Sequence, residues 1–227
     1  HQTTYGMSER LLGATVATHG DDKGLIMPPS IAPIQVVVVP ILSKEGSEEI
    51  MSAAREIVKK LKAEKIRVKL DDRDIRPGQK YYDWEIKGVP LRIELGPRDL
   101  KSNSFMCATR TGDKSSHKID DLLNSVRKEL DLVNNHMKEK AREHFNQHIK
   151  KMPNLEINGS NISIEEQLED GYVYEMAFEG NDAEAEMIEK VTGFSFLGIS
   201  TSPYSKERKC IVSGILTNNR VFLAKTY

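Results

Sequence analysis

The sequence of 227 residues has only two cysteines, Cys107 and Cys210, and they stand far apart. Two separated cysteines cannot form the disulfide framework of a small secreted domain, so a reducing compartment is the simplest inference and we expect a cytoplasmic protein. No apolar run is long enough to cross a membrane and no signal-like leader is present, so we expect no membrane partner. The net charge of −1 argues only weakly for or against a nucleic-acid partner.

The composition that remains is that of an ordinary globular protein, with 38% hydrophobic and 30% charged residues. This length accommodates one or two domains. The charges are unevenly distributed, because residues 55–80 contain ten basic and five acidic side chains whereas residues 155–190 are rich in Glu and Asp. A basic segment suits a phosphate backbone, although most such runs form a solvated helix face.

Hydrophobic periodicity predicts strands that alternate with helices in the first half of the chain. Residues 34–41 are a run of Val and Ile typical of a strand buried on both faces, and residues 47–61 show helical spacing with Ser47 as the candidate N-cap. The pattern further predicts strands at 66–70, 91–95 and 105–109, a polar loop at 71–80 and a short helix at 81–87. Such alternation indicates βαβ units and an α/β fold with a mixed sheet.

The two ends of the chain show weaker patterns. Residues 1–20 predict a strand and a helix, too little to bury a core, so we expect this piece to dock on another part of a protein. Residues 119–152 form one long helical pattern, on which His144 and His148 lie one turn apart. That spacing suits a metal, but no third ligand is evident and a solvated helix face is the simpler interpretation. After a boundary at 153–159 the sequence predicts a small α+β tail, with strands near 172–178, 194–199 and 221–225 and a helix near 183–192.

The segment around residues 91–95 carries the most informative polar side chains. Apolar residues alternate there with Arg92 and Glu94, which would therefore face the opposite side of the sheet. A guanidinium fork on a rigid strand can read the edge of a nucleobase. Arg98 and Asp99 follow the end of this strand, where side chains can reach a ligand. The same pattern also suits a polar sheet surface followed by an ordinary turn.

Three blocks in the chain resemble, in the same order, those of prolyl-tRNA synthetases of the archaeal and eukaryotic type, which are class II enzymes. Residues 2–29 resemble motif 3 of the catalytic domain. The second block resembles the anticodon-binding domain and consists of Trp84-Glu85, Lys87-Gly88-Val89-Pro90, Arg92 and Gly96-Pro97-Arg98-Asp99. The third block resembles the terminal tail and consists of Ala224-Lys225-Thr226-Tyr227.

This resemblance implies a C-terminal portion made of three parts. Residues 1–30 would end the antiparallel-sheet catalytic domain, residues 31–152 would form a mixed-sheet anticodon-binding domain with a long connecting helix, and residues 153–227 a small α+β zinc-binding-like domain. The implied enzyme is an ATP- and Mg²⁺-dependent proline–tRNA ligase, which makes prolyl-adenylate and transfers proline to tRNA(Pro). The implied partners are tRNA(Pro), proline, ATP and a second copy joined through the catalytic core, with no role for DNA.

The resemblance also assigns the nucleotide contacts to the first block. Arg10 matches an arginine that lies against ATP, and a guanidinium suits a triphosphate or an adenine face. Ser8 matches a hydroxyl-bearing position that touches the nucleotide. Gln2, Thr4 and Gly6 match positions that line the adenylate pocket. Because motifs 1 and 2 and the main proline pocket have no counterpart in the sequence, we expect the segment alone to be inactive.

The anticodon contacts implied by the resemblance lie in the second block. Glu85 and Arg92 match residues that read the second anticodon base, and Arg98 and Asp99 match those that read the third. Both bases are guanine in every proline anticodon. The chemistry agrees, because arginine donates to guanine O6 and N7 whereas a carboxylate accepts from its N1 and N2 edge. Those edges are accessible in unstacked loop bases.

The last domain departs from the pattern of a zinc-binding module. Only Cys210 remains of four cysteines, Ser213 stands in the place of another, and Glu179 and Glu184 occupy the region of the earlier pair. One thiolate, two carboxylates and a serine are a poor structural zinc set, so we assign no metal ligands and expect no zinc. Tyr227 matches a terminal tyrosine whose carboxylate reaches toward the active site, although termini usually fray.

Two other functions remain open. A non-catalytic RNA-binding accessory protein could use the anticodon-like domain alone, but it would have no need of an ATP-contacting Arg10. A related synthetase for threonine, histidine or glycine would share the domain fold. The residues at 87–90 and 96–99, together with Tyr227, favour proline.

Overall fold

The structure is a computed structural model that describes residues 3–42, 46–158 and 161–226. The chain divides into two compact units, residues 1–141 and 142–227. The second unit therefore begins inside a long helix, before residue 153 where the sequence puts the last domain. The division into three functional parts stays a prediction. None of the helices in the described ranges is long and apolar enough to span a membrane.

The first unit is built on a five-stranded sheet with the order β2-β1-β3-β4-β5. β1 pairs in parallel with β2 and β3, whereas β4 runs antiparallel to both β3 and β5. The predicted α/β fold with a mixed sheet is therefore confirmed. The strands are β1 (Val36–Pro40), β2 (Val68–Leu70), β3 (Leu91–Leu95), β4 (Ser104–Thr109) and β5 (Lys114–Lys118).

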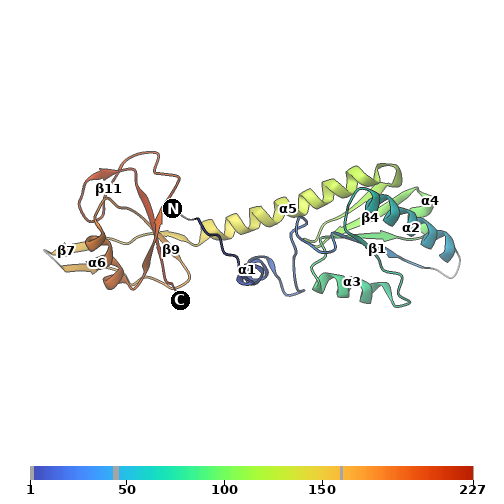
Figure 1. The fold of residues 1–227 in the computed structure, drawn as a ribbon, viewed down its shortest axis with the longest axis horizontal. Helices are drawn as coiled ribbons and strands as arrows, with labels where there is room; N and C mark the ends of the chain where they lie inside the picture. Colours follow the sequence, from blue (N-terminus) through green and yellow to red (C-terminus); the bar gives the residue numbers. More distant parts are fainter. Residues whose placement is uncertain (1–2, 43–45, 159–160, 227) are drawn as a thin grey trace. The chain divides into compact units, whose positions relative to one another are not determined.

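Helices cover both faces of this sheet (Figure 1). α2 (Ser47–Ala63) and α5 (Leu122–Gln147) lie on one face and α3 (Pro77–Ile86) lies on the other. Val36 and Val38 of β1 pack with α2 and α5, while Val37 and Val39 pack against Trp84 of α3. This burial on both faces explains why β1 is apolar at every position before Pro40.

Several element boundaries differ from those predicted. α3 begins at Pro77, which suits a first helical turn because proline lacks the N–H that would be unpaired there, so the polar loop is shorter than expected. Ser47 is not an N-cap, because it is the first residue of α2 and Gly46 occupies the cap in a left-handed conformation. A 3₁₀ turn at Ile119–Asp121 precedes the long helix. The helix ends at Gln147, earlier than predicted, and the strand β6 (Ile149–Lys151) follows the helix.

The N-terminal residues form a helix without the strand expected before it. Residues 3–8 have no regular structure, and α1 (Arg10–His19) buries none of its residues. Its apolar side chains are uncovered, with exposed fractions of 53% for Leu11, 55% for Leu12 and 37% for Val16. The expectation that this piece needs another surface to dock on agrees with this exposed face.

The second unit contains the end of α5, a four-stranded sheet of order β10-β13-β9-β6 and the helix α6 (Asp182–Thr192). Tyr174, Ile188 and Leu223 are in its core. α6 begins with a capping box in which Asn181 and Glu184 bond each other's backbone N–H groups. The other strands are β7 (Leu155–Asn158), β8 (Asn161–Ile164), β9 (Val173–Ala177), β10 (Ser195–Ile199), β11 (Arg208–Lys209), β12 (Leu216–Thr217) and β13 (Arg220–Ala224).

Candidate nucleic-acid interface

Arg92 and Glu94 lie on the face of the sheet that α3 covers. Their neighbours across β1 are Val37 and Val39, which belong to the cluster around Trp84. Each of the two charged residues is only 8% exposed. The alternative of a polar, solvated sheet surface is therefore wrong, because α3 packs over this face. The alternating pattern of the strand could not show this packing.

The guanidinium of Arg92 has an anchored inner side and a weakly bonded outer edge. Its Nε donates to Glu94 Oε1 at 2.9 Å, and the side chain of Glu94 is 11% exposed. Its Nη1 reaches Glu85 Oε1 at only 3.4 Å, and Nη2 has no hydrogen-bond partner among the described residues. The outer edge therefore faces a carboxylate on α3 whose side chain is 32% exposed. Of the predicted site residues, Glu85 and Arg92 are thus brought together.

Tyr81 completes this arrangement and was not predicted as a site residue. The guanidinium carbon of Arg92 lies 3.9 Å from the centre of its ring. Burial, followed by the nearby charge of Glu94, raises the pKa of Tyr81 to about 12, so its hydroxyl remains protonated at neutral pH. A sequence signal did exist, because Tyr81 and Glu85 are four residues apart and therefore share one face of α3.

Arg98 and Asp99 lie on α4 (Pro97–Lys101), a short helix directly after β3 that the sequence analysis described only as the end of the strand. Asp99 Oδ2 accepts a hydrogen bond of 2.8 Å from the backbone N–H of Gly96 and so fixes the start of this helix. The charge of Asp99 contributes, after burial and Glu94, to the raised pKa of Tyr81. Arg98 is exposed and has no ion-pair partner in the described part of the chain.

The charges of this cluster are balanced rather than strongly basic. Glu85, Glu94 and Asp99 alternate with Arg92 and Arg98, and Lys114 Nζ approaches Glu94 Oε1 to 3.9 Å. A phosphate site would require an excess of cations. A surface that offers donors and acceptors side by side instead matches the edge of a nucleobase, which also carries both.

The predicted nucleotide contacts of the first block are separate from this cluster. Thr4, Gly6, Ser8 and Arg10 are all exposed, and the side chains of Thr4, Ser8 and Arg10 form no hydrogen bond or ion pair with other described residues. Gln2 lies outside the described residues, as does Tyr227 at the other end of the chain. The exposed guanidinium of Arg10 and the exposed hydroxyls of Thr4 and Ser8 suit one side of a nucleotide.

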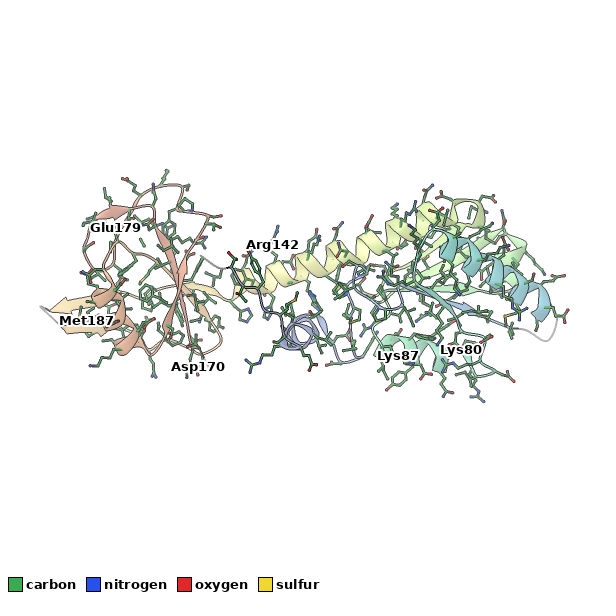
Figure 2. The ribbon with its side chains drawn as sticks, in the orientation of Figure 1. Lys80, Lys87, Arg142, Asp170, Glu179 and Met187 are labelled. Atoms are coloured by element: carbon green, nitrogen blue, oxygen red, sulfur yellow. The ribbon has the colours of Figure 1, made fainter. Side chains whose placement is uncertain are left out.

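The residues at the positions of a zinc site, among them Cys210, Ser213 and Glu179, form hydrogen bonds within the protein. Cys210 Sγ accepts hydrogen bonds from the backbone N–H groups of Glu179 at 3.2 Å and Ser213 at 3.4 Å. Burial acts to raise the pKa of Cys210, but these bonds outweigh it and the pKa is lowered. The carboxylate of Glu179, which Figure 2 labels, instead accepts from Thr217 and Asn219. These donor groups do not converge, so they do not fit a zinc ion.

The predicted placement of both histidines on the long helix is wrong for His148, because α5 ends at Gln147 and His148 lies in the turn after it. His148 Nδ1 lies 2.7 Å from the backbone oxygen of His144, and the two rings stack at 4.1 Å. The ring of His148 also stacks on Tyr172 at 5.5 Å. Across residues 3–42, 46–158 and 161–226, no three His, Cys, Asp or Glu side chains gather as a metal site requires.

Comparison with known proteins defines first the class of domain and then the enzyme family. Residues 35–129 match the family described as "Anticodon binding domain", and this segment contains the whole cluster around Arg92. The first unit therefore carries an anticodon-binding domain.

The chain as a whole is similar to proline–tRNA ligases. The enzyme of Methanosarcina mazei is 40% identical over 229 residues, which cover 100% of this chain and 46% of the relative. That of Thermococcus kodakarensis is 51% identical over 157 residues, or 69% of this chain and 33% of the relative. Giardia lamblia prolyl-tRNA synthetase in complex with prolyl-adenylate has a TM-score of 0.77 and 27% identity, with 96% of this chain and 48% of that chain covered. The predicted prolyl-tRNA synthetase family is thereby confirmed, for a chain that spans about half the length of the relatives it matches.

Proposed function

We propose that this chain is the part of an ATP-dependent proline–tRNA ligase that reads the anticodon of tRNA(Pro) and supplies the motif 3 contact to ATP. The observation that carries this proposal is the cluster of Arg92, Glu85 and Tyr81. It presents a guanidinium edge and a carboxylate together, within a segment that matches anticodon-binding domains.

In this proposal the second anticodon base binds at the outer edge of Arg92. Nη1 and Nη2 donate to guanine O6 and N7, and Glu85 accepts from the N1 and N2 groups of the same base. The 3.4 Å contact between Arg92 and Glu85 is long enough to be exchanged for these bonds at little cost. Glu94 holds Nε throughout and Tyr81 supports the guanidinium plane, so the fork is oriented before the RNA arrives.

The third anticodon base is assigned to Arg98 and Asp99. Arg98 is exposed and free to turn toward a base, whereas one oxygen of Asp99 is used by the backbone N–H of Gly96. The other carboxylate oxygen can accept from guanine N1 and N2. α4 follows β3 directly, so both base positions lie along one continuous stretch of chain.

The reaction of the intact enzyme consists of two steps. Proline attacks the α-phosphate of ATP to form prolyl-adenylate and pyrophosphate, and the proline is then transferred to the terminal ribose of tRNA(Pro). Arg10 is proposed as the catalytic contact that balances phosphate charge, with Thr4, Gly6 and Ser8 beside the adenylate and Gln2 completing the set. Mg²⁺ would supply further charge neutralisation on the phosphates.

The remaining assignments follow from the same proposal. Residues 1–30 belong to the catalytic domain, 31–152 to the anticodon-binding domain with its long helix, and 153–227 to a small domain that holds no zinc. The enzyme acts in the cytoplasm as a homodimer joined through its catalytic core. Tyr227 would bring its carboxylate toward the active site. A non-catalytic accessory protein is the alternative, but the similarity of the whole chain to proline–tRNA ligases favours the enzyme.

Substitution of the anticodon guanines tests this function. The 227-residue chain is titrated into fluorescently labelled tRNA(Pro) transcripts in which either the second or the third anticodon base is changed from guanine to adenine. Each change is expected to weaken binding by about 1–3 kcal/mol, as for the loss of a bidentate base contact. A transcript with a changed base in the D loop is the matched control. Equal affinity for all four RNAs would refute the proposal.

A further inference from the structure

Arg110, which directly follows β4, connects the turn at residues 21–24 to the end of α3. Its side chain is 2% exposed. Nη1 donates to Asp21 Oδ2 at 2.9 Å, and Nη2 donates both to Asp21 Oδ1 and to the backbone oxygen of Gly24. Nε donates to the backbone oxygen of Glu85 at 3.0 Å. One buried guanidinium thus binds a segment that follows α1 and the residue assigned to the second anticodon base.

The segment after this turn lies directly against the end of α3. The backbone N–H of Leu25 donates to Ile86 O and that of Met27 donates to Gly88 O, both at 3.1 Å. Gly24 has a φ of 124° and Gly88 a φ of 68°. A Cβ at Gly24 would lie 2.7 Å from Ile86 Cα, and a Cβ at Gly88 would lie 2.7 Å from atoms of Leu25. The two stretches of backbone are therefore in close contact, and both glycines are required for it.

The ion pair between Arg110 and Asp21 is strong where residues 21–27 meet the end of α3, a contact that we call the seam. Arg110 grips Asp21 with two parallel N–H groups, the arrangement in which guanidinium and carboxylate bind best. The hydrogen bond from Arg110 is the main cause that lowers the pKa of Asp21 to about 2, so the carboxylate is charged at neutral pH. The turn is also closed by its own bonds between Asp21 and Gly24. Movement of either partner is thus resisted by the other.

We propose that Arg110 is a positioning residue that holds Glu85 in register for the anticodon base and couples that base to residues 21–27. This inference rests on the proposed function. The backbone oxygen of Glu85 accepts hydrogen bonds from Arg110 Nε and from the backbone N–H groups of Lys87 and Gly88. The carboxylate of Glu85 is therefore set 3.4 Å from Arg92 by contacts on the far side of its own main chain.

The coupling follows from the shared guanidinium. A base that pulls Glu85 displaces the last turn of α3, and this turn is bonded to Arg110 and to residues 25–27. If base binding stabilises the ordered form of residues 21–27, then ordering those residues first must increase the affinity for the base by the same free energy, because coupling is reciprocal. Residues 21–27 follow α1, which begins at Arg10, so these contacts form a covalent and hydrogen-bonded route from the proposed base site to the helix assigned to ATP.

The variant Arg110→Gln tests the positioning role, and Arg127→Gln is the matched control. Arg127 also forms an arginine–carboxylate pair in the first unit, with Glu64, but its side chain is 54% exposed. Affinities are measured for a tRNA(Pro) anticodon hairpin and for the same hairpin with adenine as the second anticodon base. Arg110→Gln should reduce the guanine-over-adenine preference about tenfold and leave the adenine hairpin unaffected, as expected for one lost base contact. An unchanged preference, or an equal loss for both hairpins, would overturn the positioning role.

Amide hydrogen exchange at Leu25 and Met27 tests the coupling. In the parent chain the hairpin should slow both amides, and in Arg110→Gln it should have no effect on them. Asp21→Asn keeps the bond from Arg110 to Glu85, so it should retain the guanine preference and lose the hairpin-dependent slowing. Slowing that persists in both variants would overturn the coupling.

The two proposals can fail separately. Equal affinity of the parent for both hairpins would overturn the proposed function and, with it, the base-reading part of this inference. The clamp, meaning the bonds from Arg110 to Asp21, Gly24 and Glu85, is tested without RNA. Arg110→Gln should then speed amide exchange at Leu25 and Met27, whereas Arg127→Gln should not. Unchanged exchange in Arg110→Gln without RNA would overturn the clamp. If Arg110→Gln does not fold, Arg110→Lys is used, which keeps the charge and loses the fork.

Discussion

Arg92 is a buried cation whose guanidinium binds Glu94 through Nε, while Nη1 and Nη2 form an outer edge near Glu85. The anchor at Nε is 2.9 Å from Glu94, and the plane rests on Tyr81. Burying a charge is tolerated when it is paired, and loss of one partner leaves the other uncompensated. Because Glu94 and Tyr81 already hold the guanidinium, the proposed base contact requires only the long contact with Glu85 to be exchanged, which is how pre-organised sites gain affinity.

The variant Arg92→Lys tests the planar fork. Lysine keeps the positive charge beside Glu94 but cannot donate two parallel hydrogen bonds to guanine. We expect tRNA(Pro) binding to weaken by about 1–3 kcal/mol, measured by calorimetry. Arg127→Lys, at an exposed ion pair, should bind as the parent does. An Arg92→Lys chain that folds normally and binds with parental affinity would show that the fork is not used.

Sequence reasoning located part of this site and missed its support. Alternation along residues 91–95 is enough to place Arg92 and Glu94 on one face, and the family resemblance adds Glu85. Tyr81 was missed because its stacking depends on how α3 crosses the sheet, which no local pattern encodes. Arg110 was missed because its partner Asp21 is 89 positions away in the sequence.

At the scale of elements, α3 is held to the sheet by the end of β2. Asp71 directly follows β2 and accepts a 2.6 Å hydrogen bond from Trp84 Nε1, two from the guanidinium of Arg73 and one from the backbone N–H of Arg73. Lys80 Nζ donates to the backbone oxygen of Asp71 at 3.0 Å, and Figure 2 labels both Lys80 on α3 and Lys87 directly after this helix. This network fixes the helix that carries Tyr81 and Glu85, so it determines the geometry of the base site.

The carboxylate of Asp71 should make folding of the first unit pH-dependent. Burial acts to raise its pKa, but hydrogen bonds from Arg73 and Trp84 outweigh this and lower the pKa from 3.8 to about 2. A lowered carboxyl pKa stabilises the fold above pH 3.8, and this stabilisation is lost as the pH falls through 2. The shift corresponds to about 2 kcal/mol at neutral pH.

Urea unfolding at several pH values measures this contribution. In the parent chain the free energy of unfolding should fall between pH 4 and pH 2, and Asp71→Asn should be less stable at pH 7 with a shallower fall. Asp74→Asn, in the same loop, serves as the control because no hydrogen bond or ion pair is formed by its side chain within the described residues. Parallel pH profiles for the parent and Asp71→Asn would contradict this role.

The elements themselves were predicted unevenly, and the reasons are physical. β1 and β3 were found because burial on one or both faces requires a strong apolar pattern. β5 was missed because Lys114–Lys118 contains no apolar residue and is ordered by pairing with β4. The end of the long helix was misjudged because residues 148–152 continue its pattern but pair with β9.

At the scale of the whole molecule, the proposed function gives the chain a tRNA-binding surface but only one edge of a catalytic site. α1 exposes its apolar side chains, and Thr4, Gly6, Ser8 and Arg10, which are assigned to ATP, are exposed as well. The proline–tRNA ligases that match the chain are about twice as long. Binding and catalysis should therefore be separable in this protein.

Aminoacylation by the 227-residue chain tests that separation. Incubated with ATP, Mg²⁺, radiolabelled proline and tRNA(Pro), the chain should form no prolyl-tRNA above background, because the sequence contains no counterpart of motifs 1 and 2. The same preparation should bind tRNA(Pro), which shows that it is folded. Turnover above background would contradict the proposed division of roles.

The most direct test of the base-reading claim is the affinity of the chain for an anticodon hairpin that carries 7-deazaguanine as the second anticodon base. This analogue removes only the N7 acceptor and keeps the Watson–Crick edge. If Arg92 donates to O6 and N7, binding should weaken about tenfold relative to guanine. Equal affinity for the two hairpins would contradict the assignment of Arg92 to that base.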